Sequence, residues 1–194
     1  DPSGKDMRCF VAIEIDEERR QAVRRVVDEV RAMTTVAGAR ISWARPAGWH
    51  VTLKFLGDVA DSGLDGVREA LATAVRGLGC FEIRLRALAG WPRGSRARVL
   101  AVGVEDAGHS ARLALGIDDA LEPLGFARET RDYVPHLTVA RLRDGAAARA
   151  IAQATAPFEE TLFGTMPVER MGLYESVLEP DGAKYRRIED YALE

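Results

Sequence analysis

The same short strand motif occurs twice in this chain, each time at the same place in a repeated order of elements. His50–Leu53 and His136–Val139 both read His, apolar residue, Thr, apolar residue. Each copy opens the second strand of a predicted strand–helix–strand unit, whose first strands are Cys9–Ile15 and Val99–Val104. The two histidines are 86 residues apart, and nearly the same distance separates the two first strands. The repeat predicts two like α+β lobes that face each other.

Alternation along a strand predicts which side chains of each motif share a face. His50 and Thr52 are expected on one face. Val51, Leu53 and Phe55 are expected on the other face, where they can join the core. The second motif follows the same rule. Each lobe would therefore present an imidazole and a hydroxyl side by side on a sheet whose back is buried.

Two such pairs suit phosphodiester cleavage by acid–base catalysis. His50 and His136 are the candidate pair, because the unperturbed pKa of histidine, about 6.5, suits both proton uptake and proton donation. Thr52 and Thr138 can donate hydrogen bonds to the non-bridging phosphate oxygens. Arg141 lies an odd number of residues after His136, so it shares this face only if the strand bends or bulges. Its guanidinium could then bind the phosphate with two donors.

Other chemistries fit the sequence less well. Two histidines can bind zinc, but no Cys or carboxylate recurs at ligand spacing beside either motif. A serine hydrolase would need a motif such as Gly-x-Ser-x-Gly, which the sequence lacks. We therefore expect no metal and no cofactor. Tyr133, just before the second motif, is a candidate for stacking a substrate base, although packing at the rim is the simpler interpretation.

Composition favours a soluble globular protein with a substantial core. Of 194 residues, 47% are hydrophobic and 29% are charged, unlike a disordered chain. No apolar run approaches the roughly 18 residues that cross a bilayer. The net charge of −3 excludes a general basic field for nucleic acid, so a basic site must be local. Arg93, Arg96 and Arg98 could form one, although a solvated loop is the simpler interpretation.

One bilobal domain is expected over Met7–Glu194. The polar stretch Asp1–Asp6 is interpreted as a remnant of protein production. Cys9 and Cys80 lie in apolar stretches and are expected as small buried side chains. Two cysteines give no disulfide framework, which favours a reducing cytoplasm.

The paired motifs resemble those of the two-histidine phosphoesterase superfamily. Trp49–Val59 and Tyr133–Arg141 are similar to the two motifs of its RNA 2′,3′-cyclic phosphodiesterases, the ThpR/LigT or 2′-5′ RNA ligase family. Met7–Ile13 resembles the opening strand of that family, and Leu173–Ser176 resembles a closing strand. The resemblance therefore runs almost from end to end.

The resemblance implies an α+β fold with two pseudo-symmetric lobes of mainly antiparallel sheet, helices outside and a central cleft. It implies metal-independent hydrolysis of a terminal RNA 2′,3′-cyclic phosphate to a 2′-phosphate, with a weak side activity that forms 2′-5′ bonds. At the matching positions, His136 would be the base and His50 the acid. Thr52, Thr138 and Arg141 would bind the phosphate.

The motifs recognise a phosphate and leave the rest of the substrate open. The partner implied is an RNA 3′ end that bears a 2′,3′-cyclic phosphate, or a nucleotide, acted on by a cytoplasmic monomer with no membrane association. One alternative is the same chemistry on a small cyclic nucleotide or an ADP-ribose cyclic phosphate. Another is a non-catalytic module that binds RNA ends, although the complete set of motif residues argues against it.

Overall fold

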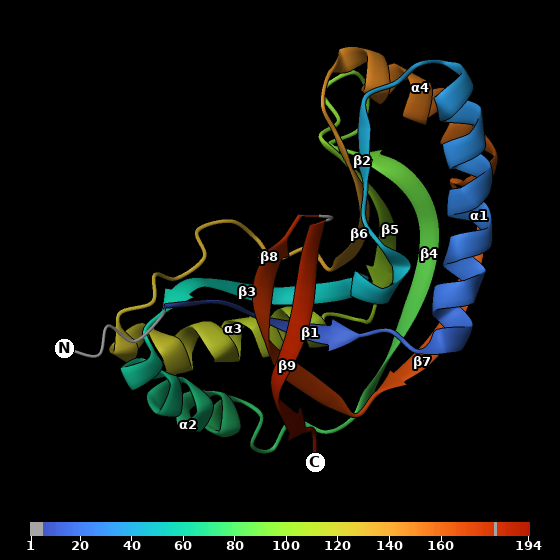
Figure 1. The fold of residues 1–194 in the computed structure, drawn as a ribbon. Helices are drawn as coiled ribbons and strands as arrows, with labels where there is room; N and C mark the ends of the chain where they lie inside the picture. Colours follow the sequence, from blue (N-terminus) through green and yellow to red (C-terminus); the bar gives the residue numbers. More distant parts are fainter. Residues whose placement is uncertain (1–5, 181) are drawn as a thin grey trace.

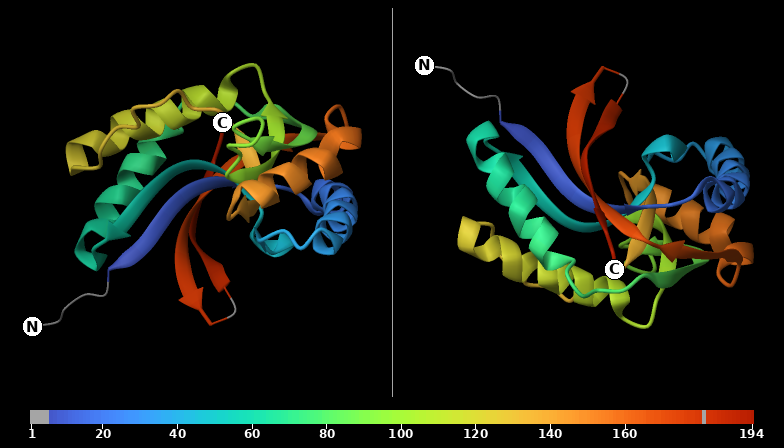
Figure 2. Two further views of the ribbon diagram at one scale, coloured as in Figure 1. Left: turned by 90° about the horizontal axis from the view of Figure 1, so that it is seen from above. Right: turned by 90° about the horizontal axis from the view of Figure 1, so that it is seen from below.

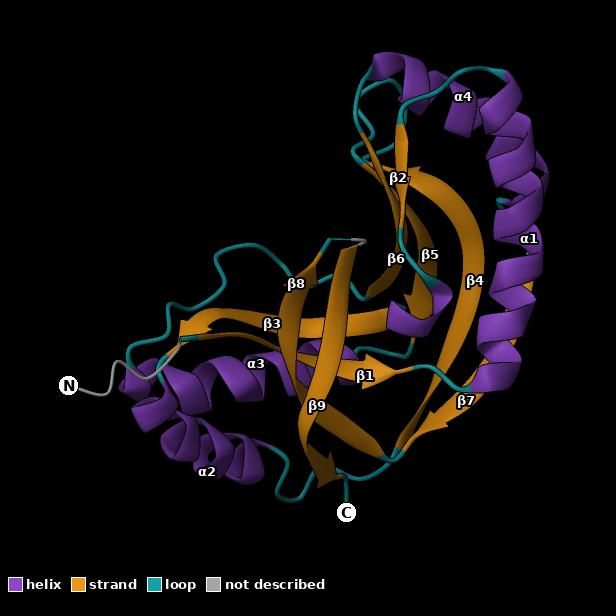
Figure 3. Ribbon diagram, viewed as in Figure 1, coloured by secondary structure: helices purple, strands orange, loops and turns teal. Residues whose placement is uncertain are grey.

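The computed structural model describes residues 6–180 and 182–194. In these residues the chain forms one antiparallel sheet of nine strands with four α-helices (Figures 1 and 3), which confirms the predicted α+β class. Of the expected remnant, only Asp6 lies within the described residues. None of the helices in the described part of the chain is long and apolar enough to cross a membrane.

The two predicted strand–helix–strand units are present, from β1 through α1 to β3 and from β5 through α3 to β6. The strands are β1 (Met7–Glu14), β2 (Ile41–Trp43), β3 (His50–Val59), β4 (Phe81–Trp91), β5 (Val99–Glu105), β6 (His136–Leu142), β7 (Leu162–Val168), β8 (Arg170–Glu179) and β9 (Gly182–Ala192). The helices are α1 (Glu17–Val36), α2 (Leu64–Ala74), α3 (His109–Leu121) and α4 (Gly145–Thr155). A short 3₁₀ helix, Ala156–Phe158, separates α4 from β7.

The strand order is mirrored about the two strands that carry the motifs. It runs β7-β4-β5-β6-β3-β1-β8-β9, with β2 paired to β6 outside this path. Thus β6, β5 and β4 on one side correspond to β3, β1 and β8 on the other. The motif strands β6 and β3 are neighbours at the centre, where the two halves of the sheet meet.

The linking helix of each repeated unit covers the opposite half of the sheet. α1 follows β1 but packs against α4 and β7, whereas α3 follows β5 but packs against α2 and β3. Figure 2 shows the two helical pairs at opposite ends of the molecule. Because of this exchange, each half of the sheet is covered by the linking helix that belongs to the other half. A single cluster of buried side chains runs through both halves.

Local signals explain where the helices begin. The side chain of Asp16 accepts a hydrogen bond from the Arg19 backbone N–H at 2.8 Å and caps α1, and Asp144 caps α4 in the same way. Val23 and Val27 are buried on one stripe of α1. The buried stripe of α1 therefore joins the main core of the protein.

The two cysteines differ in their surroundings. Cys9 is buried on β1, as predicted. Cys80 is exposed, contrary to the prediction, because it precedes β4 and its Sγ donates to the carbonyl of Leu193 at 3.0 Å. The apolar context of Cys80 therefore marks the approach to a strand and not a buried position.

A buried ion pair links β3 to the helix that covers it. The side chains of Lys54 and Asp118 are 8% and 11% exposed and form a direct salt bridge. Lys54 also donates to the carbonyl of Ala127 at 2.8 Å, and Asp118 accepts from the backbone N–H of Glu129 at 3.1 Å. These contacts join β3, α3 and the segment that leads toward β6.

Replacing Lys54 with Met should lower the free energy of unfolding by about 3 kcal/mol, because Asp118 would remain buried without its charged partner. Urea unfolding followed by circular dichroism measures this change. Arg24→Met breaks the exposed pair of Arg24 with Asp28 and should cost about 0.5 kcal/mol or less. Equal effects of the two substitutions would contradict a structural role for the buried pair.

Candidate functional site

The two motif strands meet at one residue pair, Val51 with Leu137, and both side chains are buried. Because the pairing is antiparallel, each histidine lies opposite the threonine of the other motif, on the face away from the core. The opposed residues are His50 with Thr138 and Thr52 with His136. Opposed side chains on one face have Cβ atoms about 4.5–5.5 Å apart. The register thus brings the four polar motif residues together as two crossed His–Thr pairs.

Each motif strand contains a β-bulge one residue after its threonine. On β6, Thr138 lies opposite Ala101 and Ala140 lies opposite Leu100, which leaves Val139 as the extra residue. The shift between β1 and β3 at the corresponding point leaves Leu53 extra in the same way. A bulge displaces the alternation by one position. Side chains beyond each bulge therefore exchange faces.

The bulge at Val139 brings Arg141 onto the face of the motif. Arg141 lies opposite Val99, whereas Thr138 lies opposite Ala101. Val99 and Ala101 are two residues apart and share a face, so Arg141 and Thr138 share it as well. The Arg141 side chain is exposed. It is long enough for its guanidinium to reach toward the crossed pairs.

The matching bulge at Leu53 turns Phe55 outward. Phe55 is 68% exposed, and its ring centroid lies 6.2 Å from that of Phe10. The predicted core position of Phe55 is therefore wrong, because strict alternation was assumed through the bulge. Phe55 and Arg141 are each five residues after a motif histidine, and the odd offset noticed for Arg141 applied equally to Phe55.

Both motif histidines are held by a backbone carbonyl two residues earlier. His50 Nδ1 lies 2.6 Å from the carbonyl oxygen of Gly48, and His136 Nδ1 lies 2.9 Å from that of Val134. A carbonyl oxygen can only accept, so Nδ1 must carry the proton. Nε2 of each ring is then the nitrogen left to exchange a proton with a substrate.

The surroundings of the two rings differ. His50 stacks on Phe10 at 4.7 Å and meets the edge of Tyr185 at 5.1 Å between centroids. Burial lowers the pKa of His50, and the hydrogen bond to the Gly48 carbonyl opposes this shift only in part. His136 is exposed, with the ring of Trp91 parallel to it at 6.4 Å. One histidine thus sits in an aromatic cluster and the other is open to solvent.

Tyr133 connects the segment before β6 to the other motif strand. Its hydroxyl donates to the carbonyl oxygen of Thr52 at 2.8 Å. The side chain is half-buried, and burial raises the pKa of the phenol. This hydrogen bond ties the approach to His136 to the strand of His50, and the predicted stacking of Tyr133 on a substrate base stays a prediction.

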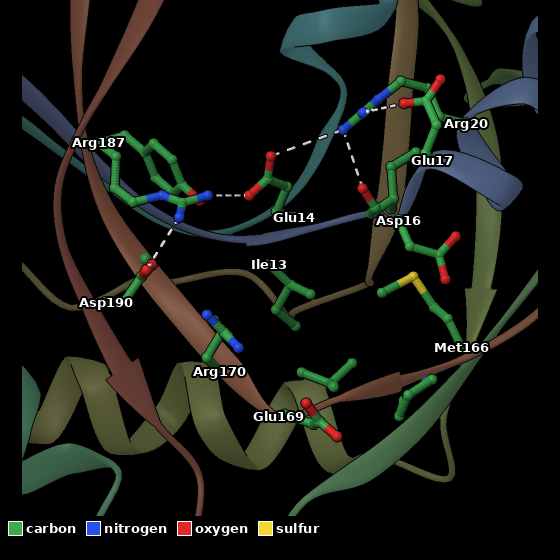
Figure 4. A pocket seen from close by; sticks show the side chains of 15 residues that line it. Ile13, Glu14, Asp16, Glu17, Arg20, Met166, Glu169, Arg170, Arg187 and Asp190 are labelled. Carbon is green, nitrogen blue, oxygen red and sulfur yellow. Dashed lines mark hydrogen bonds and ion pairs between the residues drawn. The ribbon is translucent and has the colours of Figure 1, made fainter.

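A cavity of about 350 Å³ lies at the end of β1, but neither motif histidine lines it (Figure 4). Its centre is an ion-pair network in which Arg187 contacts both Glu14 and Asp190. The charged lining residues are Glu14, Asp16, Glu17, Glu169, Asp190, Arg20, Arg170 and Arg187. Carboxylates outnumber guanidinium groups, so this cavity is a poor site for a phosphate.

The third histidine lies apart from the motif pair. His109 begins α3 and stacks on Phe81 at 5.2 Å between ring centroids. The described residues contain no group of three or more His, Cys, Asp or Glu side chains arranged to hold a metal ion. The candidate site therefore comprises His50, Thr52, His136, Thr138 and Arg141, with the exposed Phe55 at its edge.

The fold and this face define an α+β protein in which two equivalent His-x-Thr strands meet at the centre of one antiparallel sheet. The 2′-5′ RNA ligase superfamily matches residues 18–178. The chain belongs to this superfamily, which confirms the resemblance carried by the paired motifs.

Curated relatives are similar over nearly the whole chain. Proteins from Methanothermobacter thermautotrophicus and Archaeoglobus fulgidus, both named RNA 2′,3′-cyclic phosphodiesterase, are 32% and 30% identical. Those alignments cover 96% and 93% of this chain and 99% and 97% of the relatives. A crystal structure of a Thermus thermophilus protein is 30% identical, with a TM-score of 0.74 and coverage of 96% and 98%. E. coli LigT complexed with 3′-AMP, 23% identical with a TM-score of 0.75 over 97% and 98%, shares the fold.

The carbonyl contacts predict one tautomer for both motif histidines. Neutral His50 and His136 should carry their proton on Nδ1, although the free imidazole prefers Nε2. Long-range ¹H–¹⁵N correlation spectra of the ¹⁵N-labelled protein distinguish the two forms. A protonated Nε2 in either neutral ring would show that its carbonyl contact does not hold in solution.

Proposed function

We propose that this protein hydrolyses a terminal 2′,3′-cyclic phosphate on RNA to a 2′-phosphate. The observation that carries the proposal is the pair of crossed His–Thr groups on one face, with Arg141 brought beside them by the bulge. The names of the curated relatives support this substrate. The candidate residues offer no third metal ligand beside the histidines, so the proposed chemistry uses protons alone.

The cyclic phosphate is bound through its non-bridging oxygens. Thr52 and Thr138 donate hydrogen bonds from opposite strands, and the Arg141 guanidinium supplies two parallel donors and a positive charge. These donors are fixed by the sheet before the substrate arrives. They therefore stabilise the charge that builds on the phosphoryl oxygens in the transition state.

The two histidines move one proton each. Nε2 of His136 takes a proton from water as the water oxygen bonds to phosphorus. Nε2 of His50 gives a proton to the 3′ oxygen as the bond between phosphorus and that oxygen breaks. The product carries a 2′-phosphate and a free 3′-hydroxyl. Each Nδ1–H continues to donate to its backbone carbonyl, which keeps the ring oriented in both protonation states.

The same face can run the reaction with a different nucleophile. If a 5′-hydroxyl of a second RNA replaces water, the bond formed is a 2′-5′ phosphodiester and the 3′ oxygen again leaves with a proton. Water is far more abundant than RNA ends, so hydrolysis dominates. The name of the superfamily is consistent with this side activity.

Replacing either motif histidine with Ala should lower kcat/KM by about 10²–10⁴-fold, the usual contribution of a positioned acid or base. The substrate is an RNA oligonucleotide that ends in a 2′,3′-cyclic phosphate, incubated with EDTA, and the product is identified as a 2′- or 3′-phosphate by mass spectrometry and enzymatic digestion. His109→Ala is the matched control, because that histidine lies outside the site.

Wild-type protein that forms a 2′-phosphate in EDTA would support both the reaction and its metal independence. Loss of activity with EDTA would overturn the metal-independent mechanism. Turnover of a mononucleotide or an ADP-ribose cyclic phosphate without turnover of RNA would replace the proposed substrate. RNA binding without turnover of any of these would leave a binding module as the function.

The lowered pKa of His50 predicts a pH optimum below neutrality for the histidine pair. The reactive form holds one proton on the histidine pair, and burial moves the pKa of His50 below its ordinary value of 6.5, so the pH at which that form is most populated moves downward. On the acidic side activity falls as the base becomes protonated, and kcat/KM is bell-shaped. A profile that stays flat from about pH 5 to about pH 8 would contradict the histidine pair.

A further inference from the structure

Two further arginines continue the face of the site beyond Arg141. β2 pairs with the end of β6, where Ser42 lies opposite Arg141. One step farther, the backbone N–H of Arg143 donates to the carbonyl of Arg40 at 3.1 Å. Arg143 is two residues after Arg141 and Arg40 is two residues before Ser42. Alternation therefore places both on the same face as Arg141.

A side-chain contact supports this placement. Arg143 Nε donates to the hydroxyl of Ser42 at 3.0 Å, and Ser42 shares its face with Arg141 through their pairing. Arg40, Arg141 and Arg143 are all exposed. At the end of β6, Arg143 follows Arg141, and Arg40 lies opposite Arg143 on the neighbouring chain segment. We call these three arginines the row; it leads away from the motif histidines.

The charges of this row are not neutralised by neighbouring carboxylates. Within residues 6–180 and 182–194, Arg40, Arg141 and Arg143 form no ion pair, whereas Arg187 near the cavity of Figure 4 contacts two carboxylates. The net charge of the chain is −3. An uncompensated row of arginines on an acidic protein favours a local, anionic ligand.

Arg93 and Arg98, which were singled out in the sequence, do not belong to this row. Arg93 pairs with Glu159 at 2.9 Å. The carbonyl of Arg98 accepts from the backbone N–H of Leu142, whose side chain is buried on the other face, so the register sets Arg98 apart from Arg141. The row formed by Arg40 and Arg143 could be recognised only once β2 was known to pair with β6.

We propose that Arg40 and Arg143 bind the RNA backbone on the 5′ side of the terminal nucleotide. This proposal rests on the proposed function, because the site fixes where the cyclic phosphate lies. Residues two apart on a strand are about 6.6 Å apart, comparable to the step between successive phosphates in an extended RNA strand. Arginine binds phosphate through paired donors without reading the base. The row therefore selects a polynucleotide end over a mononucleotide and accepts any sequence.

The test compares two substrates in one variant. Arg40→Gln combined with Arg143→Gln should lower kcat/KM at least tenfold for an RNA oligonucleotide that ends in a 2′,3′-cyclic phosphate, mainly through KM. Hydrolysis of a nucleoside 2′,3′-cyclic monophosphate should change less than twofold. The affinity for a fluorescent RNA with a terminal 2′-phosphate, measured by anisotropy, should fall at least tenfold. The slope of log affinity against log salt should become shallower by about 1.4, because two phosphate contacts are lost.

The matched control is Arg76→Gln with Arg112→Gln, which removes the same charge from the helical side of the molecule. Arg76 follows α2, Arg112 lies on α3, and neither belongs to the row. Equal losses of RNA affinity and of kcat/KM on RNA in both double variants would show that the effect comes from net charge. They would overturn the proposed role of the row. Equal losses on RNA and mononucleotide would do the same. If wild-type protein binds RNA but hydrolyses neither substrate, the proposed function fails. The anisotropy comparison of the two double variants then tests by itself whether the row binds RNA.

Discussion

The content of the central face is determined by strand alternation and by the interruption that follows each motif threonine. Alternation alone places His50 and Thr52 above a core formed by residues such as Val51. The extra residues Leu53 and Val139 then reverse the alternation. Without these bulges the face would lack its guanidinium, and a phenyl ring now exposed would be buried. Each bulge leaves one residue unpaired and redirects the side chains that follow it, Phe55 on β3 and Arg141 on β6.

The exchange of linking helices makes this face dependent on the whole chain. The two halves of the sheet join at a single residue pair, Val51 with Leu137, which is too small a contact to fix their relative position. α1 and α3 each cross to the other half, and Lys54 and Asp118 join β3 to α3 where that helix lies against it. Tyr133 adds a hydrogen bond between the approach to β6 and β3. The relative position of the crossed His–Thr pairs is thus maintained by packing behind the sheet.

Much of this arrangement could be predicted from the sequence, because it depends on local patterns. The repeated His-x-Thr strands, the cap at Asp16 and the start of α3 at His109 all follow from residue order. The exposed Phe55 and Cys80 were missed, because a bulge or a strand boundary overrides the local apolar pattern. The strand order and the crossing of the helices depend on contacts between distant residues, which no periodicity in one segment encodes.

The unlike residues five positions after each histidine give the site a direction. Two equivalent His–Thr pairs related by an approximate half-turn could bind a phosphodiester in two orientations. The second orientation would interchange the proposed acid and base roles of His50 and His136. Under the proposed function, Arg141 on one strand and Phe55 on the other would remove this ambiguity, since the reversed orientation would set a charged oxygen against a hydrocarbon ring. The repeat supplies the symmetry of the scaffold, and a single difference between its copies supplies polarity.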